Sequence, residues 1–203
     1  MKRKLYSFSQ KEISHLLISV VVMSILVTTV WFGFSDNLAV SLVNLGMGFL
    51  LIAPAFVLHE LGHKFVSQKY GYYAEYRMWT QGLIFAIIIT ILSGGRFMFI
   101  APGAVYFGGG FARTSRDKIA KIGLAGPIVN LFLVAIFGLV GILSTGIWQM
   151  VGLLGAYVNA WLAIFNLIPF APLDGQKIFA WDKKIWGIAI GLAVVAFITV
   201  STV

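Results

Sequence analysis

The chain has 203 residues, of which 60% are hydrophobic and only 11% are charged. A soluble domain typically carries about 25% charged residues, so this composition excludes an ordinary soluble fold. The sequence contains no cysteine, which excludes disulfide frameworks, thiol catalysis and cysteine-ligated zinc. Its net charge of +8 comes from cations in short gaps between apolar runs, which is typical of a multi-span membrane protein rather than of a nucleic-acid-binding protein.

Five apolar runs are long enough to cross about 30 Å of hydrocarbon as helices, at about 1.5 Å per residue. The predicted spans are residues 13–34, 38–66, 119–143, 147–168 and 185–202. A sixth apolar run, residues 82–107, is interrupted by Ser93-Gly94-Gly95-Arg96 and by Pro102-Gly103. Its pieces of about a dozen residues are too short to span as helices, so we expect a re-entrant or β-hairpin segment near residues 82–110.

These runs predict an all-α polytopic membrane protein, with about five transmembrane helices plus the membrane-associated segment. We expect one domain over residues 1–203. Its core is expected near residues 38–180, with an N-terminal span at 13–34 and a C-terminal span at 185–202.

The cations predict the orientation of the chain. They precede the first predicted span, follow the second, precede the third and follow the fourth. All these gaps are cytoplasmic under the positive-inside rule only if residues 82–110 enter and leave the membrane by the same face. Then 14 of the 15 cations are cytoplasmic, Arg96 being the exception, and the N-terminus is cytoplasmic as well.

A candidate metal motif, His59-Glu60-Leu61-Gly62-His63, lies near the end of the second predicted span. Residues four apart share one face of a helix, so both imidazoles can bind one metal ion. Neutral imidazole suits zinc, and Glu60 is placed to take a proton from a water molecule at the metal. The alternative is a pair of histidines that only hydrogen-bond to neighbours, which leaves the costly intramembrane carboxylate of Glu60 without a role.

Two histidines leave a zinc ion short of ligands, because catalytic sites usually have three protein ligands. The acids beside the fourth and fifth spans are Asp174 and Asp182, and Asp182 lies among lysines and a tryptophan, as an interfacial anchor does. The re-entrant topology places Asp174, at the end of the fourth span, at the same depth as the histidine pair. The alternative role of Asp174 is a helix or turn cap after Pro172.

Three motifs together resemble the signatures of the site-2 protease family of intramembrane zinc metalloproteases. In the family's order, they are His59-Glu-Leu-Gly-His63, Ala125-Gly126-Pro127-Ile-Val-Asn130 and Asn166-x-x-Pro-x-x-Pro-Leu-Asp174-Gly175. The resemblance implies one zinc ion per chain, with His59, His63 and Asp174 as its ligands and Glu60 as the catalytic acid/base. It also implies cleavage of a peptide bond in or beside a substrate's transmembrane helix. The chain resembles the minimal form of the family, without an added PDZ or CBS domain.

Three further features are candidates for roles around such a site. Asn130 and Asn166 are amides within predicted spans that could stabilise an oxyanion or orient the substrate, and an interhelical hydrogen bond is the alternative. Residues 103–111 could offer a strand edge to an extended substrate, and a plain glycine-rich loop is the alternative. His15 has no partner at a metal-binding spacing, and we expect it to lie at the membrane interface.

The leading functional hypothesis is a zinc-dependent intramembrane endopeptidase of the cell membrane, with its active site toward the cytoplasm and a membrane-protein substrate. A second hypothesis is a proton- or metal-coupled transporter in which Glu60, His63 and Asp174 form the pathway, because polar groups inside spans also mark pathways. A third is a catalytically idle protein that binds and retains membrane proteins. The lipid bilayer is an expected partner and nucleic acid is not. A homo-oligomer is compatible with the sequence.

Overall fold

The computed structural model describes residues 7–96, 98, 102–108 and 114–202. Five of its helices are long and apolar enough to cross a membrane, and two shorter helices and a two-stranded sheet accompany them. In chain order the elements are α1 (Gln10–Val27), the π-helical turn η1 (Thr28–Phe32), α2 (Leu38–Lys69), β1 (Ala74–Met78), α3 (Thr80–Leu92), β2 (Gly103–Phe107), α4 (Arg116–Leu143), α5 (Ile147–Leu167), α6 (Asp174–Trp181) and α7 (Lys183–Ser201). The five predicted spans are therefore confirmed, and each predicted end lies within three residues of the observed one.

Polar side chains begin three of the long helices just before their apolar runs. The Ser9 hydroxyl accepts a hydrogen bond from the backbone N–H of Glu12 in α1. Asn37 and Asp182 accept from the first free N–H groups of α2 and α7 in the same way. Such caps satisfy backbone donors that have no partner within the helix, so they fix where each span starts.

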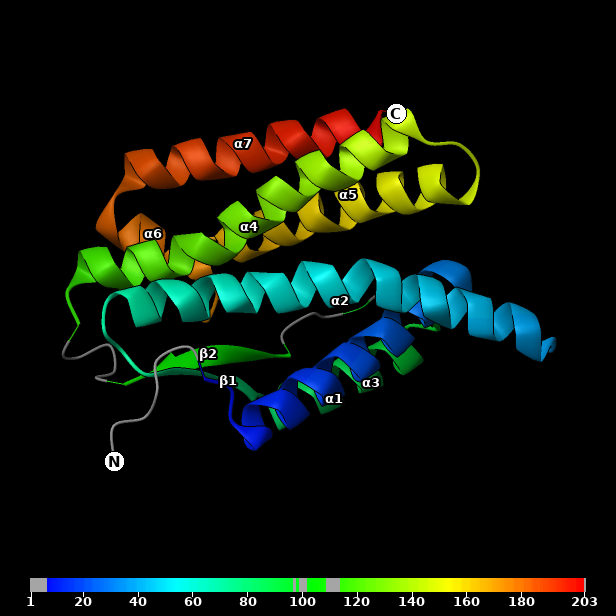
Figure 1. The fold of residues 1–203 in the computed structure, drawn as a ribbon, viewed down its shortest axis with the longest axis horizontal. Coiled ribbons are helices and arrows are strands. Elements are labelled where there is room, and N and C mark those ends of the chain that lie inside the picture. Colours follow the sequence, from blue (N-terminus) through cyan, green and yellow to red (C-terminus); the bar gives the residue numbers. More distant parts are fainter. Residues whose placement is uncertain (1–6, 97, 99–101, 109–113, 203) are drawn as a thin grey trace.

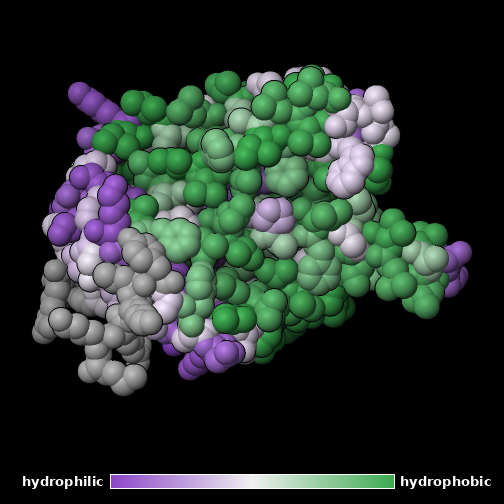
Figure 2. Space-filling view, in the orientation of Figure 1, coloured by the Kyte–Doolittle hydropathy of each residue, from purple (hydrophilic) through white to green (hydrophobic). Residues whose placement is uncertain are grey.

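Helix α2 lies between two groups of elements (Figure 1). On one side, α4, α5 and α7 pack together with α6 at their end, and on the other side lie α1, α3 and the sheet. Figure 2 shows a broad hydrophobic surface over the helices, while hydrophilic residues gather chiefly at the end that holds α6 and the sheet. This distribution suits a molecule whose helices face lipid, because lipid tails solvate apolar side chains.

The segment between the strands leaves and returns at the same end of the molecule. β1 pairs antiparallel with β2, from Ala74 opposite Phe107 to Met78 opposite Gly103, and the Trp79 N–H donates to the Pro102 carbonyl at 2.8 Å. Between these points α3 runs beside α1 (Figure 1). The described parts of the predicted segment near 82–110 thus agree with the re-entrant alternative, and they combine a helix with a strand. Its partner strand, β1, lies outside the predicted range.

For residues 103–111 the sequence left a strand or a glycine-rich loop open, and Gly103–Phe107 form a strand. Residues 109–113 lie outside the described residues. Gly103 permits a close approach here, because a Cβ at this position would collide with the Arg77 carbonyl and the Tyr76 hydroxyl. The sheet can therefore pack its buried Tyr76 against α1 and α2.

The contact between α4 and α5 depends on glycine at position 152. A Cβ there would overlap the backbone nitrogen of Gly141, and backbone cannot move aside as a flexible side chain can. We therefore predict that Gly152→Ala separates the two helices and destabilises the protein by about 1–3 kcal/mol. Thermal unfolding in detergent measures this effect.

Gly138→Ala, on α4, is the matched control, because a Cβ at position 138 meets nothing within 4 Å. This control should unfold at the wild-type temperature or slightly above it, since alanine favours helix over glycine. Equal unfolding temperatures for the two variants would contradict the prediction.

Candidate metal centre

Two histidines from α2 and the first residue of α6 bring three possible ligand atoms together. His59 Nε2 lies 3.0 Å from His63 Nε2, and Asp174 Oδ2 lies 3.5 Å and 3.0 Å from these two nitrogens. Ligands about 2.0–2.1 Å from a tetrahedral zinc ion are separated by about 3.3 Å. All three side chains are buried, and together they could hold one metal ion. The donor set of two neutral imidazoles and one carboxylate suits zinc.

Helix α4 fixes the other nitrogen of each imidazole. His63 Nδ1 lies 2.7 Å from the carbonyl of Ile122, and His59 Nδ1 lies 2.5 Å from Asn130 Oδ1. A carbonyl oxygen can only accept, so each Nδ1 carries the proton and each Nε2 keeps its lone pair for a metal. The same helix therefore sets the tautomer that metal binding requires.

Gly126 lies between these two α4 residues and leaves the space that an ion needs. A Cβ at position 126 would stand 2.5 Å from the Nε2 atoms of both His59 and His63. Any larger residue would fill the space beside the ligand atoms. Steric exclusion thus explains why the second residue of the Ala-Gly-Pro motif is glycine.

Asn130 makes the interhelical contacts that were one of its two predicted alternatives. Its amide nitrogen donates to the Ala55 carbonyl at 3.0 Å and to Asn159 Oδ1 at 2.9 Å, so both N–H groups are used. Because both N–H groups are used and the residue is fully buried, Asn130 has no donor left for an oxyanion. The expected substrate or oxyanion role of Asn130 gives way to the interhelical alternative, with its oxygen holding His59.

The sequence predictions did not single out Asn159, although an amide within an apolar span is itself a signal. It is a fully buried amide on α5 whose nitrogen donates to the Gly155 carbonyl at 2.8 Å, which turns its oxygen toward Asn130. An amide within an apolar span marks a hydrogen-bonding need. The sequence alone did not show which helix would meet it.

Glu60 and Asn166 both line a cavity of about 350 Å³ beside the three ligand residues. Other parts of its wall come from β2, α4 and the turn before α6. Glu60 is buried, and its Oε2 has no hydrogen-bond partner within the described part of the chain. Asn166 is half-buried and donates to the Leu162 carbonyl of its own helix at 3.0 Å. The cavity thus brings a free carboxylate oxygen next to the candidate metal ligands.

Asp174 is held as a carboxylate. Burial alone would raise the pKa of Asp174, but the positive charge of the Lys177 ammonium beside it lowers that pKa. Lys177 Nζ donates to Asp174 Oδ1 at 2.7 Å, which leaves Oδ2 turned toward the histidines. Asp174 therefore does more than cap a helix. Its ion pair with Lys177 is a contact that the sequence did not single out.

Among proteins of known name, the chain is 34% identical over 195 residues to a Methanocaldococcus jannaschii protein named as a zinc metalloprotease, MJ0611. The match covers 95% of both chains. The chain belongs to the site-2 protease family. Two more relatives of this chain are also named as zinc metalloproteases. They are MJ0392 of the same organism, 30% identical over 136 residues, and Rip3 of Mycobacterium tuberculosis, 30% identical over 145 residues.

These two alignments cover 64% and 67% of the chain, but only 32% and 31% of the relatives. No family model and no solved structure gave a match. By its family the protein is a zinc metalloendopeptidase, and five of its helices are long and apolar enough to cross a membrane. The group of His59, His63 and Asp174 could hold its zinc ion.

The hydrogen bond from His59 to Asn130 predicts a role in metal affinity. Replacing Asn130 by leucine removes the acceptor of the Nδ1 proton, so the imidazole loses its orientation. We predict that Asn130→Leu lowers zinc affinity by about 10- to 100-fold, the usual effect of losing a partner of a metal-ligating histidine. Titration of the purified apoprotein with zinc in detergent measures this.

Asn166→Leu is the matched control, because Asn166 bonds only to its own helix among the contacts described. It should bind zinc as the wild type does. Wild-type affinity in Asn130→Leu would contradict the orienting role of Asn130.

Proposed function

We propose that this protein hydrolyses a peptide bond in or next to a transmembrane segment of another membrane protein. The observation that carries the proposal is the depth of the candidate metal centre. His59 lies ten residues before the end of α2 at Lys69, about 15 Å along a helix that is apolar enough to span a membrane. A protease of soluble substrates has no need to bury its ligands at such a depth.

The residues of the cavity divide the reaction between them. His59, His63 and Asp174 would hold zinc, which polarises the scissile carbonyl and acidifies water when bound. Glu60 takes the proton of the attacking water and later gives it to the leaving amine. Its free Oε2 and its place beside the ligand residues support this role. Asn166, whose amide lines the same cavity, is the candidate to orient the substrate or stabilise the oxyanion.

Strand β2 is the candidate surface for an extended substrate. A peptide bond in an intact helix is shielded by its own hydrogen bonds, so the substrate must unwind before attack. Pro102 to Tyr106 line the cavity, and β2 has a hydrogen-bonded neighbour on one side only among the described residues. An extended peptide could therefore pair with β2 through its backbone and lie beside the metal centre.

A proton-relay transporter is the weaker alternative. A relay requires groups that exchange protons, whereas each Nδ1 in this site is committed to an oxygen that only accepts. That arrangement favours a resident ion, as an enzyme requires.

We also propose that the N-terminus and the active site face the cytoplasm of a cell membrane. The support is the positive-inside rule, applied to the cations near the end of α2, at the start of α4, in α6 and at the start of α7. Trp79 and Pro102 are joined by a hydrogen bond at the sheet, which supports a segment that enters and leaves by the face where these cations lie.

The function is tested with reporters that each carry one transmembrane helix with a helix-breaking residue in its cytoplasmic half. We predict that the wild type cleaves at least one reporter within or beside that helix and that Glu60→Gln cleaves none while retaining zinc. Asp117→Asn is the control, because this exposed carboxylate lies on α4 away from the cavity. Equal cleavage by Glu60→Gln would remove the proposed mechanism, and the absence of cleavage by wild type would overturn the function.

The orientation is tested with single cysteines, since the chain has none of its own. Asp36 lies exposed between η1 and α2, and Asp117 has a 43% exposed side chain at the start of α4. We predict that a membrane-impermeant maleimide labels Asp36→Cys on intact cells, and that Asp117→Cys is labelled only after the membrane is opened. The reverse pattern would show that the active site faces outward.

A further inference from the structure

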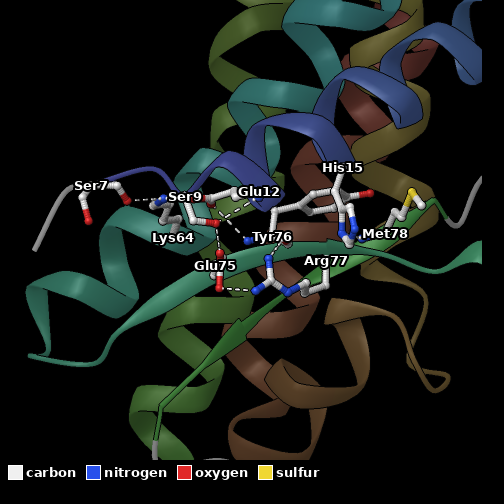
Figure 3. Close-up of polar contacts among 9 residues, drawn as sticks. All are labelled: Ser7, Ser9, Glu12, His15, Lys64, Glu75, Tyr76, Arg77 and Met78. Carbon is white, nitrogen blue, oxygen red and sulfur yellow. Dashed lines mark hydrogen bonds and ion pairs between the residues drawn. The ribbon is translucent and has the colours of Figure 1, made fainter. Parts of the chain in front are cut away.

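The outer edge of β1 is held by side chains of α1 instead of by a third strand. The Tyr76 N–H donates to Glu12 Oε1 at 3.1 Å, and the Met78 N–H donates to His15 Nδ1 at 3.2 Å (Figure 3). Glu12 and His15 are three residues apart and so share one face of α1. The two side chains can therefore reach the Tyr76 and Met78 N–H groups, which are successive donors on the same edge of β1.

The register of the sheet shows that these donors point away from β2. At the two ends of the sheet, the Trp79 N–H donates to Pro102 and the Gly108 N–H donates to Tyr73. Because the direction of backbone groups alternates along a strand, Glu75 and Arg77 turn theirs toward β2 while Tyr76 and Met78 turn theirs toward α1. By the same alternation, Gly103 and Val105 of β2 turn their backbone groups away from β1.

The acceptor on Glu12 is itself held by α2. Glu12 Oε2 accepts from Lys64 Nζ at 2.5 Å, and both side chains are only 1% exposed. Lys64 also donates to the Ser7 carbonyl at 3.0 Å and lies 3.7 Å from the ring centroid of Phe8. It directly follows the candidate zinc ligand His63 in α2, so one buried carboxylate joins β1, α1 and the helix of the metal centre.

A second set of contacts joins the start of α1 to a side chain of β1. The Ser9 hydroxyl, which caps α1, donates to the Glu75 carboxylate, and Arg77 Nη2 donates to Glu75 at 2.5 Å. The start of α1 thus binds both the backbone edge and the side chains of β1 (Figure 3). An open strand edge pairs readily with any extended chain, so closing one edge leaves only the other to accept a peptide.

We propose that Glu12 and His15 are positioning residues for the substrate. They occupy the outer edge of β1 and fix the sheet against α1 and α2, so that an extended substrate pairs with β2, beside the metal centre, and not with β1. This inference rests on the proposed function, because it assumes that the substrate binds to β2 as a strand. Neither residue touches the cavity that holds Glu60.

His15 gives the sharper test, because replacing Glu12 would leave the buried ammonium of Lys64 without its partner. His15→Leu removes the acceptor of the Met78 N–H, and His15→Asn keeps an acceptor oxygen near the position of Nδ1. Ser14→Leu is the matched control, because Ser14 is exposed and bonds only to Gln10 of its own helix among the contacts described.

The first measurement is hydrogen exchange of the full chain with zinc bound. His15→Leu should exchange the amides of residues 74–78 about tenfold faster than the wild type, since it loses one hydrogen bond. His15→Asn and Ser14→Leu should match the wild type. Unchanged exchange in His15→Leu would overturn the inference, whether or not the protein cleaves any reporter.

The second measurement is the cleavage of a reporter that the wild type accepts. His15→Leu should raise KM about tenfold and leave kcat and zinc content within about twofold, while His15→Asn restores KM. A merely structural role would lower kcat and zinc content together and would not be rescued by asparagine, and that result would overturn the inference. If exchange responds as expected but the wild type cleaves nothing, the proposed function fails and the substrate role of His15 fails with it.

Discussion

The structure depends on one helix that serves the metal centre without supplying a ligand. Ile122, Gly126 and Asn130 follow each other at intervals of four along α4, and His59 and His63 have the same spacing on α2. The acceptors of the two imidazoles, at Ile122 and Asn130, are thus about two turns apart on α4, with Gly126 midway between them. These contacts require the two helices to pack closely, and Gly62 permits it, because a Cβ there would stand 3.1 Å from the Ala125 carbonyl. Register between α2 and α4 thus sets both the tautomer of the histidines and the space for the ion.

Asparagines extend this register through the helix bundle. Asn130 joins the backbone of α2 to Asn159 of α5, so three spanning helices share one chain of hydrogen bonds that ends at His59. In lipid, helices gain little from burying apolar surface against one another, and polar contacts between them hold the arrangement. The ligand from α6 then needs only a short connection from α5 to reach the same place. A metal centre made from residues more than a hundred positions apart in the sequence becomes rigid in this way.

The sequence predicted the parts of this structure that depend on local spacing. The five spans follow from the length of apolar runs, and the pairing of His59 with His63 follows from the pitch of a helix. The meeting with Asp174 followed from the charge pattern, because only a re-entrant segment puts both motifs at one depth. Contacts between helices had no such signal. Asn130 turned its oxygen to His59 and not its amide to the cavity, which depends on Asn159 and on the packing of α5. His15, expected at the interface, accepts from β1, a strand whose partner lies about 25 residues away along the chain.

Different interactions form the two sides of the cavity. The side with α4, α5 and α6 is a web of buried hydrogen bonds around the ligands, which favours a fixed geometry for chemistry. The side with α1, α3 and the sheet presents a short strand, which suits the proposed pairing of a substrate peptide with β2 through backbone groups. The ion pair of Glu12 with Lys64 joins α1 to α2 at the residue that follows His63. A charge left alone at such a buried place is very costly, so neither partner can leave without the other and α1 stays bound to α2. The same Glu12 carboxylate also accepts from the Tyr76 N–H, so the pair links β1 to the helix that carries the candidate zinc ligands His59 and His63.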